Sequence, residues 1–398
     1  MRTSFLERSD RSRAYRGILE ENMDLTFVNR MLGISRGGGE IWDLKMAEGL
    51  EELGADVTFY VGKPLRSELP EPIEDFDYVE VPTPHLRDLA YAAPIGVGGA
   101  LSDLDARLFT LRVVSRLQEN EHDIIHVNSD PQFGRVVSQF DVPVTIKMNG
   151  PPHSLWYDYI NPFGSSYDFF RCFDAVIATG VTVPAIRERT DCEVTTVNPG
   201  VDTELFSPEG PEIPTNRPTV LFVGRFVPAK NIALLLEAFS EVLNEIPNAE
   251  LILVGEGPLE EKIASRVESL GISRSVRMPG YVENEELPRY YRGADLFALT
   301  SRHESFGMVL LEAMSCGTPV VSSRAGAAHK IVDHSVNGLL YTEGNKEELV
   351  NSLEIVLQNT DLKHQMEANA REITKSQYDW EIPAKQLHNM YTEICKII

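Results

Sequence analysis

Two glutamates, Glu304 and Glu312, are the most informative candidates for chemistry in this sequence. They flank a run, SFGMVLL, that follows the apolar segment ADLFALT and has the pattern of a helix beginning near Ser305. On one continuous helix, a spacing of eight residues separates two side chains by about 12 Å along the axis and about 80° around it. We therefore expect both carboxylates to face the same ligand.

The segment between these glutamates predicts an anion site. Free N–H groups at a helix N-terminus bind anions, and glycine lets backbone approach a ligand closely. The expected donors are Ser305, Phe306, Gly307 and Met308. Glu304 would then accept hydrogen bonds from sugar hydroxyls, the amides would hold a pyrophosphate and Glu312 would bind ribose hydroxyls, which is the layout a nucleotide sugar needs. The alternative is an ordinary helix with Glu304 near its positive end and Glu312 on a solvated face.

Three other turns between expected strands and helices add candidates in the same half of the chain. Arg225 and Lys230, in GRFVPAKN, follow the strand-like run TVLFVG and would stabilise a leaving diphosphate. The remaining candidates would contact the base or ribose of the donor: Gly255, Gly257, Pro258, Tyr281 and Val282. The alternatives are solvated surface cations for Arg225 and Lys230, and a plain turn at the glycines.

A glycine run in the first half of the chain offers a further approach for phosphate. Gly37, Gly38 and Gly39 follow the first expected strand and precede a helix beginning near Glu40. Consecutive glycines permit positive φ and expose backbone amides. Flexible surface loops use the same pattern, so this signal is weak by itself.

Composition excludes several classes of protein. The 398 residues carry a formal net charge of −23, which would repel nucleic-acid phosphates over most of the surface. The four cysteines are far apart and predict reduced thiols in a cytoplasmic protein, with neither disulfides nor structural zinc. No apolar run approaches the length of a membrane-spanning helix. Five arginines among residues 1–22 would suit an anionic membrane surface, but we favour a flexible extension there.

The elements that must position these candidates alternate between strands and helices. Apolar runs such as DIIHVN and DAVIATG fit the centre of parallel sheets covered on both faces. A proline-rich stretch, residues 206–217, separates two such series and marks the domain boundary. We expect an α/β protein with two Rossmann-like domains, with ligands bound at the carboxyl ends of the strands and in a cleft between the domains. The expected parts are an extension over 1–22, domains over 23–205 and 206–378, and a helix over 379–398.

The order of these motifs resembles a known family, the retaining glycosyltransferases of the GT-B fold and, within them, the large group called family four, or glycosyl transferases group 1. The resemblance covers almost the whole chain from Met23. It is densest in GRFVPAKN, VGEGPLEEKI and HESFGMVLLEAMSCGTPVVSS, and it extends to NPGVDTELFSP and to the YDW before the terminal helix. It implies that residues 23–205 bind the acceptor, that residues 206–378 bind the donor and that the last helix crosses back to the first domain.

The resemblance implies transfer of a hexose-type sugar from a UDP- or GDP-sugar to a saccharide or lipid-linked acceptor, with retention at the anomeric carbon. Arg225, Lys230, Glu304 and Asn149 become the catalytic candidates. Charge develops mainly on the leaving phosphate, so these cations and the helix amides would make a metal unnecessary, and we expect neither metal nor cofactor. The expected location is the cytoplasm, with peripheral contact at the inner membrane face as an option.

Two departures from the family pattern keep alternatives open. Asn149 stands where the family often has a histidine, and His153, four residues on, is a candidate substitute. In AGAAHKIV, Ala327, His329 and Lys330 replace the glycine, proline and glutamate of the family pattern. A catalytically silent nucleotide-sugar-binding subunit and a GT-B epimerase or phosphorylase therefore remain alternatives.

Overall fold

The computed structural model describes most of the chain beyond the N-terminal extension. The described residues are 23–32, 38–64, 73, 75–84, 86, 95–148, 172–180, 182–188, 190, 192–302, 304 and 306–397. The expectations for residues 1–22, Gly37, Asn149, His153 and Ser305 lie outside this range. The chain forms two compact units, one running to Asn198 and resuming at Trp380, and the other covering Pro199–Asp379.

Each unit is built on a parallel sheet, as the sequence predicts. The described strands of the first unit have the order β3-β2-β1-β4-β5-β6-β7. Their bounds are β1 (Asp24–Asn29), β2 (Asp56–Pro64), β3 (Asp77–Thr83), β4 (Ile124–Asn128), β5 (Val144–Met148), β6 (Ala175–Ala178) and β7 (Glu193–Thr196). The order reverses direction at β1, where both neighbours, β2 and β4, pair parallel to it. This is the doubly wound arrangement, in which ligands bind at the carboxyl ends of the strands.

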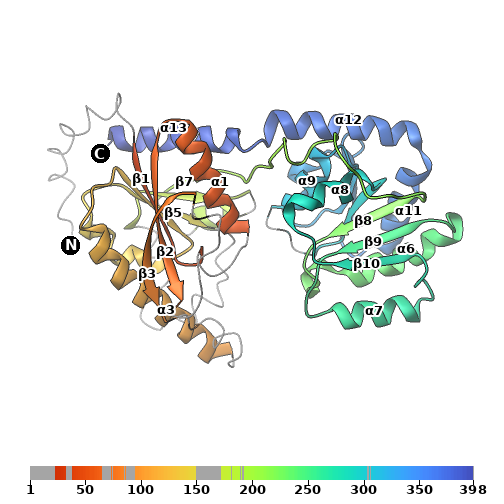
Figure 1. The fold of residues 1–398 in the computed structure, drawn as a ribbon, viewed down its shortest axis with the longest axis horizontal. Helices are drawn as coiled ribbons and strands as arrows, with labels where there is room; N and C mark the ends of the chain where they lie inside the picture. Colours follow the sequence, from red (N-terminus) through yellow and green to blue (C-terminus); the bar gives the residue numbers. More distant parts are fainter. Residues whose placement is uncertain are drawn as a thin grey trace. The chain divides into compact units, whose positions relative to one another are not determined.

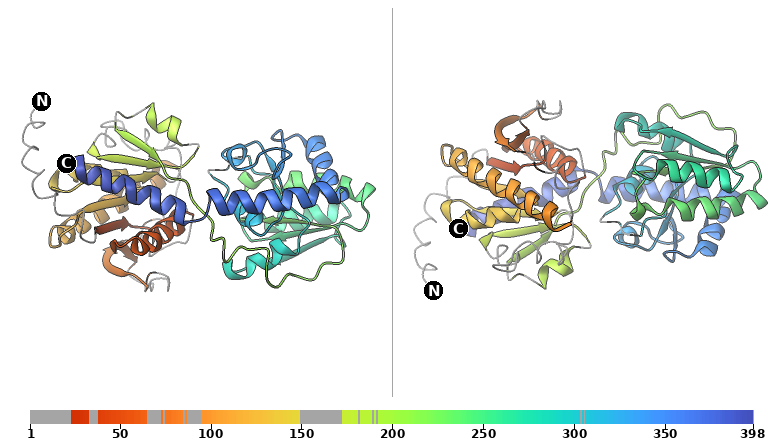
Figure 2. Two further views of the ribbon diagram at one scale, coloured as in Figure 1. Left: turned by 90° about the horizontal axis from the view of Figure 1, so that it is seen from above. Right: turned by 90° about the horizontal axis from the view of Figure 1, so that it is seen from below.

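Helices cover both faces of this sheet. They are α1 (Gly38–Glu52), α3 (Ile95–Leu117), η4 (Pro131–Arg135), η5 (Val137–Gln139), α5 (Val183–Arg187) and α13 (Glu381–Ile397). In views from opposite sides, α1 and α13 lie over one face and α3 over the other (Figure 2). The strands therefore read as continuous apolar runs because both of their faces are buried.

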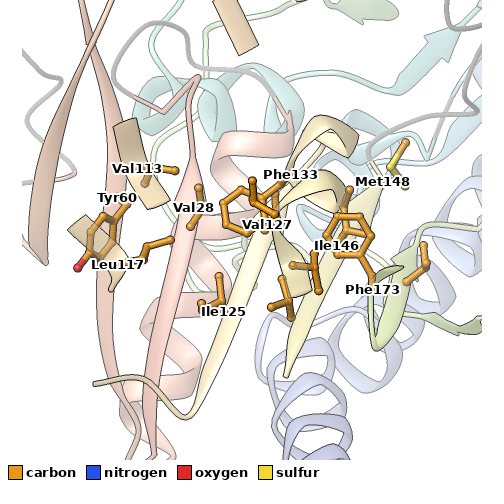
Figure 3. Close-up of a cluster of buried hydrophobic side chains, with 14 of the residues drawn as sticks. Val28, Tyr60, Val113, Leu117, Ile125, Val127, Phe133, Ile146, Met148 and Phe173 are labelled. Carbon is orange, nitrogen blue, oxygen red and sulfur yellow. The ribbon is translucent and has the colours of Figure 1, made fainter. Parts of the chain in front are cut away.

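One apolar core lies under α3 and joins it to the sheet. Val28, Val127 and Ile146 from three neighbouring strands pack with Val113 and Phe133 (Figure 3). All five side chains are buried. Strand β3 and helix α3, which the sequence analysis did not propose, supply part of this core.

The second unit repeats the design with six described strands in the order β10-β9-β8-β11-β12-β13. The strands are β8 (Thr219–Val223), β9 (Glu250–Val254), β10 (Val276–Gly280), β11 (Leu296–Leu299), β12 (Val320–Ser323) and β13 (Gly338–Tyr341). The helices are η7 (Pro228–Lys230), α6 (Ile232–Glu245), α7 (Glu260–Ser269), η8 (Asn284–Glu286), α8 (Leu287–Arg292), α9 (Met308–Ser315), α10 (Ala328–Ile331), α11 (Lys346–Gln358) and α12 (Thr360–Gln377). Helices α6 and α7 lie on one face, and α12 packs with α9 on the other (Figure 2). The direction reverses at β8, so the sequence motifs lie in the turns that follow these strands.

The boundary between the units differs from the predicted one at residues 205/206. Residues 199–205 belong to the second unit, because Val201 N–H donates to the Tyr378 carbonyl at 2.7 Å. The proline-rich stretch that follows is held by the same unit. There, the Arg292 guanidinium donates to the Pro211 carbonyl at 2.8 Å, and Arg371 donates to the Phe206 carbonyl at 3.1 Å.

Helix α13 belongs to the first unit, where it packs against α1 (Figure 1). The sequence analysis expected a helix over residues 379–398, and α13 occupies Glu381–Ile397 within that range. Helix α12 ends at Gln377 and α13 begins at Glu381, so Pro383 lies in the first turn of α13. Proline is tolerated there because the first N–H groups of a helix have no partner within it. Among the described residues, no helix is long and apolar enough to cross a bilayer.

We expect Tyr391→Phe to lower the free energy of unfolding by about 1–2 kcal/mol, the usual cost of losing a buried hydrogen bond. The Tyr391 hydroxyl lies 2.7 Å from His126 Nδ1, and both side chains are buried. This bond ties α13 to strand β4. The measurement is denaturant unfolding, with the partly exposed Tyr78→Phe as control. Equal stability of the two variants would contradict a stabilising role for this bond.

Candidate functional site

The carboxyl ends of β8 and β11 carry a charged pair in the second unit. Lys230 Nζ lies 2.7 Å from Glu304 Oε2, and Ser301 Oγ donates to the same oxygen at 3.2 Å. The Lys230 and Glu304 side chains are 19% and 15% exposed, so both remain accessible from solvent. Two residues that the sequence analysis assigned to catalysis from separate turns therefore meet.

Backbone contacts hold the Lys230 turn against the end of β11. The Thr300 hydroxyl donates to the Lys230 carbonyl at 2.9 Å, and Arg302 N–H donates to the Ala229 carbonyl at 2.8 Å. Asn231 adopts a left-handed conformation with φ 49°, which ends η7 before α6 begins. The ammonium is thus presented by a turn with fixed backbone.

The turn after β12 supports Glu304 from the other side. Ala327 N–H donates to the Glu304 carbonyl at 3.1 Å. Gly326 has φ 58°, and a Cβ there would lie 1.8 Å from that carbonyl oxygen. Only glycine fits this approach. The departures in AGAAHKIV leave this glycine in place, with Ala327 buried and both His329 and Lys330 exposed.

Helix α9 begins at Met308, so the expectation of one helix carrying both Glu304 and Glu312 is wrong. Gly307 precedes it in a left-handed conformation with φ 99°, and this breaks the helical path toward Glu304. The helical estimate of about 12 Å and 80° between the carboxylates does not apply. Phe306 is buried and Met308 half-buried at the helix start.

Glu312 lies within α9 and is nearly buried. Its Oε2 accepts a hydrogen bond of 2.7 Å from the hydroxyl of Tyr291 on α8. Burial raises the pKa of Glu312 to about 7, while the Tyr291 bond and the charge of Lys230 act to lower it. The influence of Lys230 on Glu312 indicates that the two expected glutamates and the lysine share one electrostatic environment.

The glycines after β8 and β9 bring two turns into backbone contact. A Cβ on Gly255, which has φ 127°, would lie 2.1 Å from the Gly224 carbonyl oxygen. A Cβ on Gly257 would lie 2.7 Å from the Phe226 carbonyl oxygen. Close backbone packing thus explains why both positions are glycine. Contact of Gly255, Gly257 and the exposed Pro258 with a donor stays a prediction.

The remaining candidates of the second unit are more open. Arg225 is exposed, next to Gly224 at the end of β8. Tyr281 is 61% exposed, and its hydroxyl donates to Glu283 at 3.1 Å, while Val282 beside it is half-buried. Arg225, Tyr281 and Val282 therefore lie outside the buried core around Glu312.

In the first unit, the glycine run ends inside a helix, because α1 already begins at Gly38. The Gly39 carbonyl accepts hydrogen bonds from Lys147 Nζ at 3.3 Å and from Asn128 Nδ2 at 3.2 Å. Lys147 Nζ also lies 3.7 Å from Asp43 Oδ1. Side chains from the ends of β4 and β5 therefore hold the start of α1.

The Asp43–Lys147 pair is fully buried and was missed by the sequence analysis. Burial raises the pKa of Asp43 to about 6 and lowers that of Lys147 to about 8. Asn29 and Asn128 donate to Asp43 Oδ2 at 2.8 and 2.7 Å. Two signals were present in the sequence: a lysine inside the apolar run VTIKM, and an aspartate on the apolar stripe of α1 that includes Met46.

Comparison with known proteins identifies the second unit. Residues 205–373 match the family described as glycosyl transferases group 1, a range that lies wholly within the unit carrying Lys230, Glu304 and Glu312. The chain carries a glycosyl transferases group 1 domain. Lys230, Glu304 and Glu312 lie within the matched range, and their contact with a donor stays a prediction.

Curated proteins similar to this chain have several different transferase names. A D-inositol 3-phosphate glycosyltransferase of Corynebacterium jeikeium is 34% identical over 224 residues, which is 52% of this chain and 53% of that protein. A sulfoquinovosyl transferase of Arabidopsis thaliana is 28% identical over 308 residues, 70% of this chain and 58% of that protein. The chain spans about half the length of the curated relatives it matches.

Solved structures share the fold of both units. A sucrose-phosphate synthase from Thermosynechococcus elongatus superposes with a TM-score of 0.76 at 20% identity, covering 95% of this chain and all of the other. HepE of Anabaena in complex with UDP gives 0.74 at 19% identity, covering 93% and all of the other chain. The protein has the GT-B fold of two Rossmann-like α/β domains, as predicted.

We expect Lys147→Met to lower the free energy of unfolding by about 3–5 kcal/mol, because it leaves the Asp43 carboxylate buried without its cation. The double variant Lys147→Met/Asp43→Asn should recover most of this loss, since it removes both charges and keeps an acceptor for Asn29 and Asn128. Denaturant unfolding at pH 7 of wild type, both single variants and the double variant measures the coupling. Strictly additive losses would show that the two charges do not interact.

Proposed function

We propose that this protein is a retaining glycosyltransferase that moves a hexose-type sugar from a UDP- or GDP-sugar to a saccharide or lipid-linked acceptor, in glycan, glycolipid or polysaccharide synthesis. The observation that carries the proposal is the Lys230–Glu304 ion pair at the strand ends of a glycosyl transferases group 1 domain, whose lysine also acts on the charge of Glu312. HepE in complex with UDP and UDP-glucose, and a mannosyltransferase relative described as GDP-mannose-dependent, support both nucleotide classes.

In the proposed reaction, the bond between the anomeric carbon and the diphosphate oxygen breaks, and a bond to an acceptor hydroxyl oxygen forms on the same face. The departing diphosphate oxygen takes the electron pair of the broken bond and accepts the proton of the acceptor hydroxyl. Lys230 and Arg225 stabilise the charge that develops on this diphosphate. Glu304 accepts from hydroxyls of the transferred sugar, and Glu312 accepts from the ribose hydroxyls. Asn149, outside the described residues, is the further candidate for a hydrogen bond to the transferred sugar.

We also propose that the reaction needs no divalent cation, because the side-chain cations and the N-terminus of α9 supply positive charge where a metal would otherwise act. Peripheral contact with the cytoplasmic membrane face accompanies a lipid-linked acceptor. The relative described as a phosphatidylinositol monomannoside mannosyltransferase supports an acceptor of that class.

The function is tested by incubating purified protein with UDP- and GDP-hexoses and candidate acceptors, with and without EDTA, and reading products by mass spectrometry. Glycosylated acceptor with equal yield in EDTA is the expected result. Donor binding without any nucleotide release would identify a silent binding subunit. Interconversion of the donor sugar without an acceptor would identify an epimerase.

We expect Lys230→Ala and Arg225→Ala each to lower kcat by about 10²–10³, the usual effect of removing one preorganised charge from a transition state. Lys262→Ala and Arg274→Ala, which alter exposed cations elsewhere in the second unit, serve as matched controls. Steady-state kinetics and thermal unfolding are measured together. Turnover near the wild-type rate in both site variants would remove them from the reaction.

Glu304→Ala and Glu312→Ala should differ in kind. A sugar contact at Glu304 predicts a lower kcat with free UDP or GDP binding almost unchanged, whereas a ribose contact at Glu312 predicts weaker binding of the free nucleotide. Calorimetric binding beside kinetics separates the two effects. If both variants lose nucleotide affinity equally, the assignment of sugar and ribose ends is incorrect.

A further inference from the structure

The hydroxyl of Tyr291 makes a buried contact for which the proposed reaction gives no role. Tyr291 is fully buried on α8, and its hydroxyl donates to Glu312 Oε2 at 2.7 Å. Phe206 and Phe297 pack edge-on against its ring. The Thr318 hydroxyl donates to the Tyr291 carbonyl at 2.7 Å, so both ring and backbone are held in place.

This contact constrains what Glu312 can do. An ionised carboxylate offers two acceptor oxygens, and Tyr291 occupies a position on one of them. The Glu312 residue is 9% exposed, so little space is left for other rotamers. A hydrogen bond from a buried, immobile hydroxyl therefore sets the plane in which the carboxylate meets a ligand.

We propose that Tyr291 is a positioning residue for nucleotide recognition: its hydroxyl holds Glu312 in the orientation that accepts ribose hydroxyls, and so makes the site prefer ribonucleotides over 2′-deoxyribonucleotides. This inference rests on the proposed function, in which Glu312 meets the ribose. Tyr291 itself does not contact the nucleotide.

The charged groups around Glu312 favour this role. Burial raises the pKa of Glu312 to about 7, and the Tyr291 bond and Lys230 are the two influences that lower it. Helix α8, which also carries Tyr291, adds Arg289 and Arg292, of which Arg292 donates to the Pro211 carbonyl at 2.8 Å. On the other helices packed against α9, Arg371 of α12 donates to Ser315 Oγ at 2.9 Å, and His329 and Lys330 of α10 are exposed. Cys316 next to the helix is neutral, since burial raises the pKa of its thiol to about 12.

The test measures the dissociation constants of UDP and GDP and of their 2′-deoxy counterparts by calorimetry. For Tyr291→Phe we expect about tenfold weaker binding of the ribonucleotide and less than about twofold change for the deoxy form, because a bond to a charged group is lost only from the ribose contact. Glu312→Gln should also reduce this selectivity. Tyr290→Phe, one residue away and half-buried, is the matched control and should keep the wild-type ratio.

The pH dependence of the selectivity ratio gives a second readout. In the wild type, the ratio should rise as pH increases through about 7, because Glu312 ionises there and becomes a stronger acceptor. In Tyr291→Phe, a bond that lowers the pKa of Glu312 is gone, so the same rise should occur at higher pH. The diphosphate titrates alike in UDP and its 2′-deoxy form, so its ionisation cancels from the ratio.

The outcomes separate this inference from the proposed function. A folded Tyr291→Phe variant that keeps the wild-type ratio and the wild-type pH midpoint overturns the positioning role while donor binding stands. A wild-type protein that prefers neither ribonucleotide over its 2′-deoxy form also overturns it. If the wild type binds neither UDP nor GDP, the proposed function itself fails.

Discussion

A parallel sheet brings the carboxyl ends of all its strands to one edge, and the polar contacts of the candidate site depend on that constraint. Lys230 and Glu304 are 74 residues apart in sequence, yet their side chains form an ion pair because β8 and β11 are neighbours. The next strand, β12, adds the turn whose Gly326 lies against the Glu304 backbone. The edge is closely packed, and glycines are required where backbone meets backbone, as at Gly255.

Asp43 and Glu312, two of the buried carboxylates among the described residues, show two ways of keeping a charge inside a protein. Asp43 has a lysine and two asparagine amides around it, whereas Glu312 has one tyrosine hydroxyl and a more distant lysine. Both keep a raised pKa, because burial outweighs these contacts. A group in this balance responds strongly to a single added or lost neighbour. Such sensitivity is typical of positions where a ligand completes the set of contacts.

The apolar runs of the sequence were sufficient to predict the two sheets. The spacing of two residues in the sequence was insufficient to predict how their side chains lie relative to each other. Apolar runs such as DAVIATG and TVLFVG predicted buried parallel strands, because strands covered on both faces have no polar side. The eight-residue spacing of Glu304 and Glu312 misled, since the helix begins only after Gly307, whose positive φ breaks the helical path back to Glu304. Tyr291 could not be found from sequence, because its partner lies 21 residues away on another helix and the contact depends on packing of α8 against α9.

The first unit is assembled from two separate stretches of chain, and this affects how the protein is made. A ribosome completes strands β1 to β7, then the whole second unit, before it produces α13. Until then, the surface of α1 and β4 that α13 covers in the folded protein is exposed, and His126 lacks its hydrogen bond with Tyr391. Folding that proceeds from the N-terminus during synthesis must therefore leave the first unit open while the second closes. The first unit is therefore synthesised first but completes its fold last. Until α13 is made, this unit is the one open to chaperone binding and to aggregation.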